Sequence, residues 1–293
     1  MSTLNTLDAN FFWVGKITPY EILCYKSFAD NGFNVKVWTY KNFLEDPHNL
    51  LIKYKINLYD ANNILDESLL FKFTQGGKKG SISSFSNLFR FTLILKNGGW
   101  WFDSDCVCLK NSREYQILAE KNDFVLGKEY DLHVGSSVIF INKKEWAEII
   151  LNEIKYRIKM NNYEFYWGEI GPNLITEVLV KHNKIDELQD QYKFYSIEAK
   201  NFQDIYKTKK SILEKLNSLT YDSYSVHLWN EIGKKHIINK NLLPPKDSYL
   251  FYLFKTYNLD EISKTYSKFS NFRFIFIFSK FLKLSYKIKN LIW

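Results

Sequence analysis

Two aspartates separated by one residue, Asp103 and Asp105, have the clearest chemistry in the sequence. They follow three aromatic residues, Trp100–Phe102, which are typical of a buried strand that ends in a polar pocket. Residues two apart on a strand point to the same face, so both carboxylates would address one site. Such oxygen ligands select Mg²⁺ or Mn²⁺, which often share their shell with substrate phosphates. The pair predicts a metal site for a nucleotide diphosphate, with two solvated surface aspartates as the alternative.

Two other motifs do not support a different chemistry. Residues 74–81 are rich in Gly and Lys, but their lysines lack the spacing of a P-loop, and we expect a mobile loop there. Cys106 and Cys108 alternate along the strand that carries the acidic pair, and they are expected to be small core residues. A zinc site is therefore not predicted.

Alternating helices and strands are expected around the acidic pair. A helix over 85–96 should end at Asn97–Gly99, a strong stop signal, directly before a strand over 100–109. The chain opens with a strand, a helix with Pro in its first turn and a second strand, over 11–14, 19–29 and 35–40. Further expected elements are strands over 124–126 and 137–141, helices over 143–159 and after Gly171–Pro172, and a strand around Val226. This order predicts an α/β fold.

The composition is that of a folded protein with an excess of cations. The 293 residues are 46% hydrophobic and 25% charged, which excludes a disordered chain. The net charge of +8 would attract polyanions, but only four of the 40 basic residues are arginines. Because arginine is the preferred reader of bases and phosphates, nucleic acid is not an expected partner. Nucleotide bias in the coding genome is the alternative explanation for the lysines.

Three cysteines, an odd number in a chain too large to need disulfides, predict a reducing compartment, by default the cytoplasm. The first ten residues lack the charged and apolar regions of a secretory signal. No uncharged apolar stretch reaches the length of about 18 residues that a membrane span needs.

The C-terminal residues differ in character from the rest of the chain. From residue 264 to 293, aromatic and aliphatic residues alternate with seven cations and no acid. Such an amphipathic, helical tail suits the surface of an anionic membrane, and a last element packed on the core is the alternative. We therefore expect a catalytic domain over 1–250 and a cationic aromatic segment over 251–293.

A longer pattern surrounds the acidic pair. Ser86-Asn-Leu-Phe-Arg90 is followed by Leu95-Lys-Asn-Gly-Gly-Trp-Trp-Phe-Asp-Ser-Asp105, and the chain also contains Phe11-Phe-Trp-Val-Gly15, Gly168-Glu-Ile-Gly-Pro172 and Val226-His-Leu-Trp-Asn230. These motifs resemble the DXD-containing sugar transferases of glycosyltransferase family 32 and its relatives. The resemblance implies a GT-A-type, Rossmann-like fold, with a mixed sheet flanked by helices that binds a nucleotide sugar. It also implies a UDP-sugar donor and transfer with retention of anomeric configuration.

The same resemblance implies roles for individual residues. Trp13 would stack on the nucleobase, with Val14 beside it, and Asn87 and Arg90 would meet the donor sugar. The remaining assignments are Asp103, Ser104 and Asp105 for metal, ribose and diphosphate, His227 as a further metal ligand, and Glu169 as an acceptor-side base or a helix cap. Lys234 and Lys235, which follow the His227 motif, could hold the leaving diphosphate, and a solvated pair of lysines is the alternative. For Arg90 a salt bridge to one of the aspartates is the alternative. The family usually has Asp where this chain has Asn87, which affects the expected donor preference.

These observations predict a hexosyltransferase that uses Mn²⁺ or Mg²⁺. The expected donor is UDP-galactose, and the expected acceptor is a bacterial surface glycan, such as capsule or lipooligosaccharide, presented on a lipid at the inner face of the cytoplasmic membrane. A protein-modifying glycosyltransferase effector is one alternative. A non-catalytic protein that binds metal or polyanions is the other.

Overall fold

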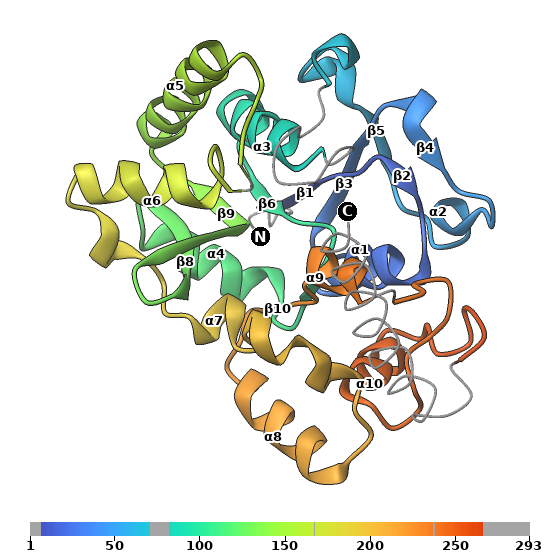
Figure 1. Cartoon of the computed structure of the whole chain (residues 1–293). Coiled ribbons are helices and arrows are strands. Elements are labelled where there is room, and N and C mark those ends of the chain that lie inside the picture. The colour runs from blue at the N-terminus through green and yellow to red at the C-terminus, as the bar shows by residue number, and fades with distance from the viewer. Residues whose placement is uncertain (1–6, 71–81, 167, 237, 266–293) are drawn as a thin grey trace, which may run out of the picture.

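The structure is a computed structural model that describes residues 7–70, 82–166, 168–236 and 238–265. Its strands are β1 (Asp8–Phe12), β2 (Gly15–Lys16), β3 (Asn34–Thr39), β4 (Leu44–Glu45), β5 (Leu58–Asp60), β6 (Trp100–Phe102), β7 (Cys106–Cys108), β8 (Phe124–Tyr130), β9 (His133–Ile141) and β10 (Ser225–His227). A six-stranded sheet in the order β5-β3-β1-β6-β9-β8 forms the centre (Figure 1). Strands β5, β3, β1 and β6 are parallel, and β9 is antiparallel to its neighbours β6 and β8.

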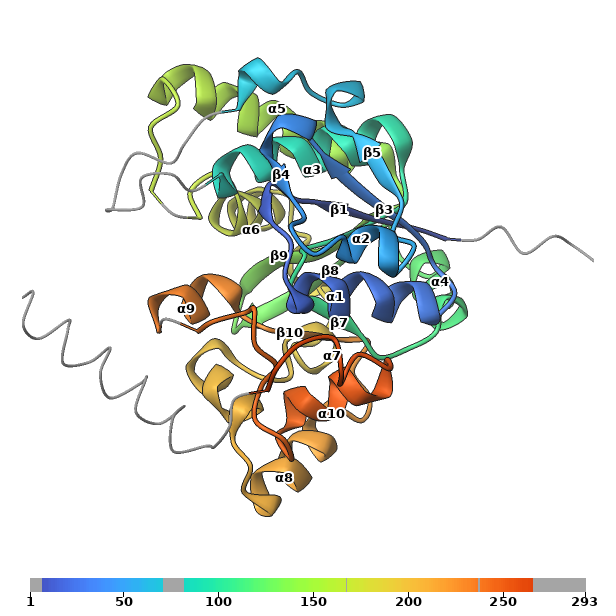
Figure 2. The same ribbon diagram turned by 90° about the vertical axis from the view of Figure 1, so that its right-hand side faces the viewer.

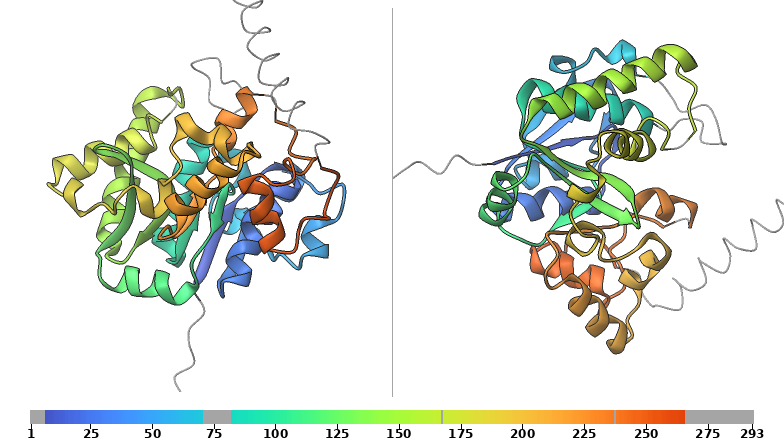
Figure 3. Two further views of the ribbon diagram at one scale, coloured as in Figure 1. Left: turned by 90° about the horizontal axis from the view of Figure 1, so that it is seen from below. Right: turned by 90° about the vertical axis from the view of Figure 1, so that its left-hand side faces the viewer.

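Helices cover both faces of this mixed sheet. They are α1 (Pro19–Asp30), α2 (Leu50–Lys53), α3 (Ser83–Asn97), α4 (Ser112–Glu120), α5 (Lys144–Asn161), α6 (Pro172–Lys181), α7 (Tyr192–Tyr195), α8 (Lys210–Thr220), α9 (Asn230–Lys235) and α10 (Tyr249–Thr256). Helices α3, α5 and α6 lie on one face, and α1 and α4 lie on the other (Figure 2). Helices α7, α8 and α10 form a further layer beyond α1, which Figure 3 shows from the other side. The expected α/β fold, a mixed sheet flanked by helices, is confirmed.

Side chains that alternate along the strands divide the core into two clusters. On β6, Trp100 and Phe102 pack with α1 and α4, whereas Trp101 packs with α3 and α5. On β1, Phe11 likewise belongs to the cluster with α1 and α4, and Phe12 belongs to the cluster with α3 and α5. This period of two places aromatic residues on both faces of the sheet, so the central strands are buried between helices.

Local signals explain where the helices nearest the site begin and end. Helix α1 starts with a capping box, in which Thr18 and Glu21 bond each other's backbone N–H, and Pro19 follows the cap. Helix α3 ends at Asn97, as expected, because Gly98 and Gly99 adopt φ of 68° and 83°. A Cβ at Gly99 would lie 2.9 Å from Nδ2 of Asn10, so the backbone passes β1 too closely for a side chain.

The prediction of one strand over 100–109 is wrong in one respect. The structure has two strands there, β6 and β7, which are joined by a turn that contains Asp103 and Asp105. The N–H of Cys106 closes this turn on the carbonyl of Asp103 at 3.0 Å. Strand β7 leaves the main sheet and pairs antiparallel with β10, which sets His227 opposite Cys106. The two carboxylates therefore do not share a face of one strand.

The edge hairpin of β8 and β9 has an irregular register. Leu126 pairs with Ile139, but the next residue, Gly127, pairs with Gly135, so residues 136–138 have no partner on β8. A second irregularity falls between Lys128 and Tyr130. Such bulges bend strands and re-aim side chains, and both of these lie beside the acidic turn.

Two expected features lie outside the described residues: the loop over 74–81 and, beyond Thr265, the amphipathic tail. Helix α10 crosses the expected domain limit at residue 250, and its Leu253 and Phe254 are buried in the same cluster as α1. Within the described ranges no helix combines the length and the apolar character that a membrane crossing requires.

Candidate active site

A cavity of about 380 Å³ opens beside the turn that carries the acidic pair. Its lining comes from the α3 helix, the β8–β9 hairpin, the start of α6, and the segments around α7 and α9. The lining residues are Ser83, Asn87, Arg90, Asp103, Asp105, Glu129, Ser136, Ser137, Gly168, Pro172, Tyr195, Ala199, His227, Trp229, Glu231, Ile232 and Lys235. Distant parts of the chain therefore meet around both aspartates.

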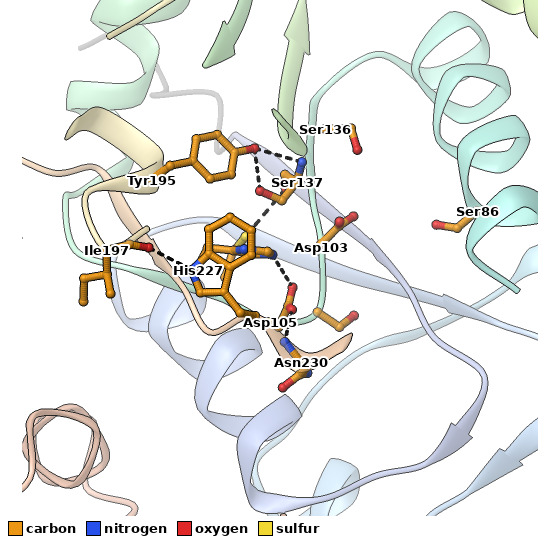
Figure 4. Close-up of polar contacts among 12 residues, drawn as sticks. Ser86, Asp103, Asp105, Ser136, Ser137, Tyr195, Ile197, His227 and Asn230 are labelled. Carbon is orange, nitrogen blue, oxygen red and sulfur yellow. Dashed lines mark hydrogen bonds and ion pairs between the residues drawn. The ribbon is translucent and has the colours of Figure 1, made fainter. Parts of the chain in front are cut away.

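The Asp105 carboxylate is held by residues that follow β10. Its Oδ1 lies 3.1 Å from Nε2 of His227, and its Oδ2 accepts a 2.9 Å hydrogen bond from the N–H of Asn230 (Figure 4). Burial by itself raises the pKa of Asp105, but His227 and the Asn230 N–H lower it to about 2. Burial lowers the pKa of His227, but the carboxylates of Asp105, Asp103 and Glu129 together raise it, so the net shift is upward. The pair is therefore a buried carboxylate beside an imidazole that is stabilised in its charged form.

Asp103 has different partners. Its Oδ1 lies 3.1 Å from the Arg90 guanidinium and accepts a 2.8 Å hydrogen bond from the Trp101 indole. Arg90 is only 4% exposed, donates to the Ser136 carbonyl, and lies 4.9 Å above the Trp101 ring. Burial raises the pKa of Asp103, and the Arg90 charge opposes that shift. Of the two roles considered for Arg90, the structure shows the salt bridge to an aspartate, formed within the cavity.

Three potential metal-ligand atoms lie within 4.8 Å of one another, on Asp105, Cys106 and His227. The Cys106 thiol donates to the Ser137 carbonyl, and burial raises its pKa well above the usual value, so it is a weak candidate ligand. The Nδ1 atom of His227 is buried and has no hydrogen-bond partner among the described residues. A carboxylate beside an imidazole, with a second carboxylate in the same cavity, fits Mn²⁺ or Mg²⁺ by its donor chemistry.

Tyr195 forms the wall opposite the acidic turn. Its hydroxyl accepts hydrogen bonds from the N–H and the side chain of Ser137, at 3.1 and 2.7 Å (Figure 4). The ring fits because two positions lack side chains: a Cβ at Gly135 would lie 2.2 Å from the Tyr195 hydroxyl, and one at Gly127 would lie 3.2 Å from its ring. Ser137 in turn accepts the backbone N–H of Asp103 on its carbonyl at 2.8 Å. Tyr195 thus positions the acidic turn through Ser137.

Trp229 packs against the imidazole ring of His227. Its indole packs edge-on at 4.3 Å between ring centres and donates to the Ile197 carbonyl at 2.8 Å. The residue has φ of 57° and ψ of 46°, a left-handed conformation that a bulky side chain rarely adopts. This conformation turns the chain so that the N–H of Asn230 meets Asp105.

Several lining residues were given no role from the sequence, among them Glu129, Ser137, Tyr195 and Trp229. Trp229 was contained in the motif around His227 but was given no role. The structure shows that Gly127 and Gly135 leave room for the Tyr195 ring, but nothing local in the sequence identifies Tyr195 as their neighbour. No signal in the sequence marked Glu129.

Several expected site residues lie elsewhere among the described residues. Trp13 lies outside the cavity lining, under the Lys240 ammonium at 5.2 Å, and Val14 packs at the edge of the α3 cluster. The Ser104 side chain turns away, with its Oγ accepting from the Tyr25 hydroxyl at 3.1 Å. Asn87 does line the cavity, against the backbone of Gly171. The ligand roles assigned to these residues stay predictions.

Glu169 and Lys234 have local partners. Glu169 accepts from the Asn161 side chain and from the N–H of Tyr166, both at 2.8 Å, and α6 begins at Gly171 without a side-chain cap. Lys234 is 63% exposed and pairs with Glu231, whereas its neighbour Lys235 lines the cavity. Lys235 is therefore better placed than Lys234 to meet an anion there.

Comparison with known proteins finds sequence similarity to sugar transferases. Residues 150–250 match the "Alpha 1,4-glycosyltransferase conserved region". The resemblance to sugar transferases is confirmed. Lactosylceramide 4-alpha-galactosyltransferase of Mus musculus is 28% identical over 158 residues, which make up 50% of this chain and 40% of that protein. The Homo sapiens enzyme of the same name is 25% identical over 159 residues, again 50% of this chain and 41% of that one. The match thus spans about two fifths of the length of these curated relatives.

Similar solved structures include PaToxG Glycosyltransferase, with a TM-score of 0.45, 12% identity, and coverage of 75% of this chain and 88% of that one. The galactosyltransferase LgtC, solved in complex with donor and acceptor sugar analogs, also has a TM-score of 0.45, with 10% identity and coverage of 89% and 98%.

Proposed function

We propose that this protein is a retaining galactosyltransferase that uses UDP-galactose and a divalent metal, Mn²⁺ or Mg²⁺, and transfers the sugar to a hydroxyl of a bacterial surface glycan such as capsule or lipooligosaccharide. The observation that carries the proposal is the meeting of Asp103, Asp105, His227 and Arg90 in one cavity, in a chain that resembles α-1,4-glycosyltransferases over residues 150–250. The curated relatives are galactosyltransferases, which supports galactose as the transferred sugar.

In the proposed reaction, the bond between the anomeric carbon and the diphosphate oxygen breaks, and the acceptor oxygen bonds to the same carbon. The acceptor proton passes to the departing diphosphate. Asp105 and His227, with Asp103, would hold the metal, which would neutralise charge on the leaving group. Arg90 and Lys235 bring further positive charge to the cavity.

The chain's own residues keep this site in one arrangement before any ligand binds. Asp105 is fixed on one side by His227 and Asn230, and Asp103 is fixed by Arg90 and Trp101. Such preorganised groups do not need to reorient as charge develops, which is the main way that an enzyme stabilises a transition state electrostatically. The buried Arg90 fork also offers fixed donors toward sugar hydroxyls.

We also propose that the protein acts in the cytoplasm at the inner face of the membrane, held there by residues 266–293. The support is the cationic and aromatic composition of those residues. A lipid-linked glycan acceptor would be presented at the same surface.

The experiment that tests the function is a donor screen. Hydrolysis of a panel of UDP- and GDP-sugars is measured by nucleotide release with Mn²⁺, with Mg²⁺ and with EDTA. The proposal expects turnover that is greatest with UDP-galactose, is lost in EDTA, and falls at least about a hundredfold in Asp105→Asn. Absence of metal-dependent turnover with every donor would overturn it in favour of a non-catalytic binder.

A further inference from the structure

Glu129 enters the cavity because it is the extra residue of a β-bulge. On β8, Lys128 pairs with Val134 and Tyr130 pairs with His133, although these partners are adjacent on β9. Glu129 between them therefore has no partner in the ladder. A bulge of this kind re-aims one side chain, and here that side chain lines the cavity.

The carboxylate of Glu129 has unused hydrogen-bonding capacity, whereas Asp103, Asp105 and Glu231, the other acids of the cavity lining, each have a polar or charged partner. Its side chain is only 15% exposed, and in the described part of the chain no hydrogen bond reaches either of its carboxylate oxygens. Nδ1 of His133 lies 4.0 Å from Oε2 of Glu129, which is beyond hydrogen-bond distance. Burial raises the pKa of Glu129, with His227 and His133 opposing the shift. A poorly hydrated carboxylate without partners is stabilised by a ligand that donates hydrogen bonds to it.

The charge of the cavity favours a neutral ligand at Glu129. Arg90, the Asp105–His227 pair and Lys235 are the groups suited to an anion or its metal. A carboxylate beside a diphosphate would repel it, whereas sugar hydroxyls are neutral donors that a carboxylate binds well. The group that meets Glu129 is therefore a sugar hydroxyl rather than a phosphate.

The position of β8 at the edge of the sheet indicates separate places for the donor sugar and the acceptor sugar. Asn87 and Arg90 lie on α3, which covers the centre of the sheet, whereas β8 is an edge strand. A glycan acceptor is longer than one hexose and must leave the cavity at an edge. The tip of the β8–β9 hairpin provides exposed surface there: Tyr130 and Leu132 are 53% and 57% exposed, and the Tyr130 ring stacks on His133 at 4.5 Å between ring centres.

We infer that Glu129 is an acceptor-binding residue, whose carboxylate accepts a hydrogen bond from a hydroxyl of the acceptor sugar, and that the Tyr130 face supports the next sugar of the glycan. The inference rests on the proposed function, because it assumes a transferase with a glycan acceptor.

The test separates acceptor binding from donor chemistry in the full-length protein. Glu129→Ala, Glu129→Gln and wild type are compared in two reactions: hydrolysis of UDP-galactose without acceptor, and transfer to the best acceptor of wild type among galactose, lactose and N-acetyllactosamine. The matched control is Glu148→Gln, on the exposed side of α5 and outside the cavity lining. Thermal unfolding of each variant shows whether the fold is retained.

The inference expects Glu129→Ala to raise the acceptor KM about ten- to a hundredfold, since a hydrogen bond to a charged group is lost. Glu129→Gln, which keeps a neutral acceptor oxygen, should give a smaller rise, and the donor KM and the rate of donor hydrolysis should stay within about twofold of wild type. If donor hydrolysis or the donor KM changes in step with transfer, Glu129 belongs to the donor site and the inference is overturned. A wild-type protein that turns over no donor would instead overturn the proposed function, and the inference with it.

Discussion

The Asp105 carboxylate links the stability of the fold to pH. Its pKa in the folded protein is about 2, below the ordinary value of 3.8. A lowered pKa contributes stability that is fully present above the ordinary value and is lost as the pH falls toward the folded value. The shift corresponds to about 2 kcal/mol in the free energy of unfolding. In Asp105→Asn this contribution should be absent.

The measurement is urea unfolding in EDTA at several pH values between 2.5 and 5. We expect the difference in unfolding free energy between wild type and Asp105→Asn to grow as the pH rises through this window, and then to level off. Asp222→Asn, at an exposed position, is the control, and its unfolding free energy should change with pH in the same way as that of wild type. A constant difference between wild type and Asp105→Asn would show that the pair with His227 is not formed in solution.

Arg90 and Asp103 should behave as one buried unit. Among the described residues, removal of Arg90 leaves the Trp101 indole as the hydrogen-bond partner of the Asp103 carboxylate, and a charge that loses its ion-pair partner in this way costs about 3 kcal/mol. We therefore expect Arg90→Met to be strongly destabilised, and Arg90→Met with Asp103→Asn to recover a large part of that loss. Chemical denaturation of the two single variants and the double variant gives the coupling energy. If the losses of unfolding free energy in the two single variants simply add up in the double variant, the ion pair is contradicted.

The edge hairpin determines the shape of the cavity through its glycines. Gly135→Ala should displace the Tyr195 ring, because the new Cβ would lie 2.2 Å from its hydroxyl, and overpacking of this kind costs about 1–3 kcal/mol. The hydrogen bonds that Ser137 donates to the Tyr195 hydroxyl should weaken with it, so we expect donor turnover to fall as well as the unfolding temperature.

Gly233→Ala on α9 is the matched control for this change. Its Cβ would meet only Ile238, at an ordinary 3.5 Å, and Ala favours the helix by about 0.5–1 kcal/mol. Unfolding temperatures of the two variants should therefore shift in opposite directions. Equal stability of Gly135→Ala and wild type would mean that the hairpin can move away from Tyr195.

For the molecule as a whole, the cations of the C-terminal residues should determine membrane binding. Replacement of Lys268, Arg273, Lys280, Lys283, Lys287 and Lys289 by Gln in the full chain should abolish co-sedimentation with anionic vesicles, since each contributes about 1 kcal/mol. The control has the same net charge, with six exposed lysines replaced elsewhere: Lys41, Lys55, Lys121, Lys144, Lys159 and Lys209. Equal loss of binding in both variants would assign the attraction to net charge rather than to the tail.

The sequence by itself determined the elements that depend on local interactions. Helix α1 follows from Thr18, Pro19 and Glu21, which lie within four residues, and the end of α3 follows from Gly98 and Gly99. The alternating order of strands and helices was sufficient for the fold class. The acidic pair and the Arg90 salt bridge could also be predicted from the sequence, because the residues involved lie within about one helix and one strand of each other.

Only the tertiary structure decided how the site is closed. Asp105 and Asn230 are 125 positions apart in the sequence, and no local pattern predicts that they are in contact. The turn that separates β6 from β7 forms because β7 pairs with β10 rather than with the main sheet, which sequence periodicity cannot show. Glu129 enters the cavity through a register shift between two strands, and Tyr195 enters because two glycines on those strands leave room for its ring. Register and close packing depend on pairs of distant segments, so they are properties of the folded chain and not of any stretch of sequence.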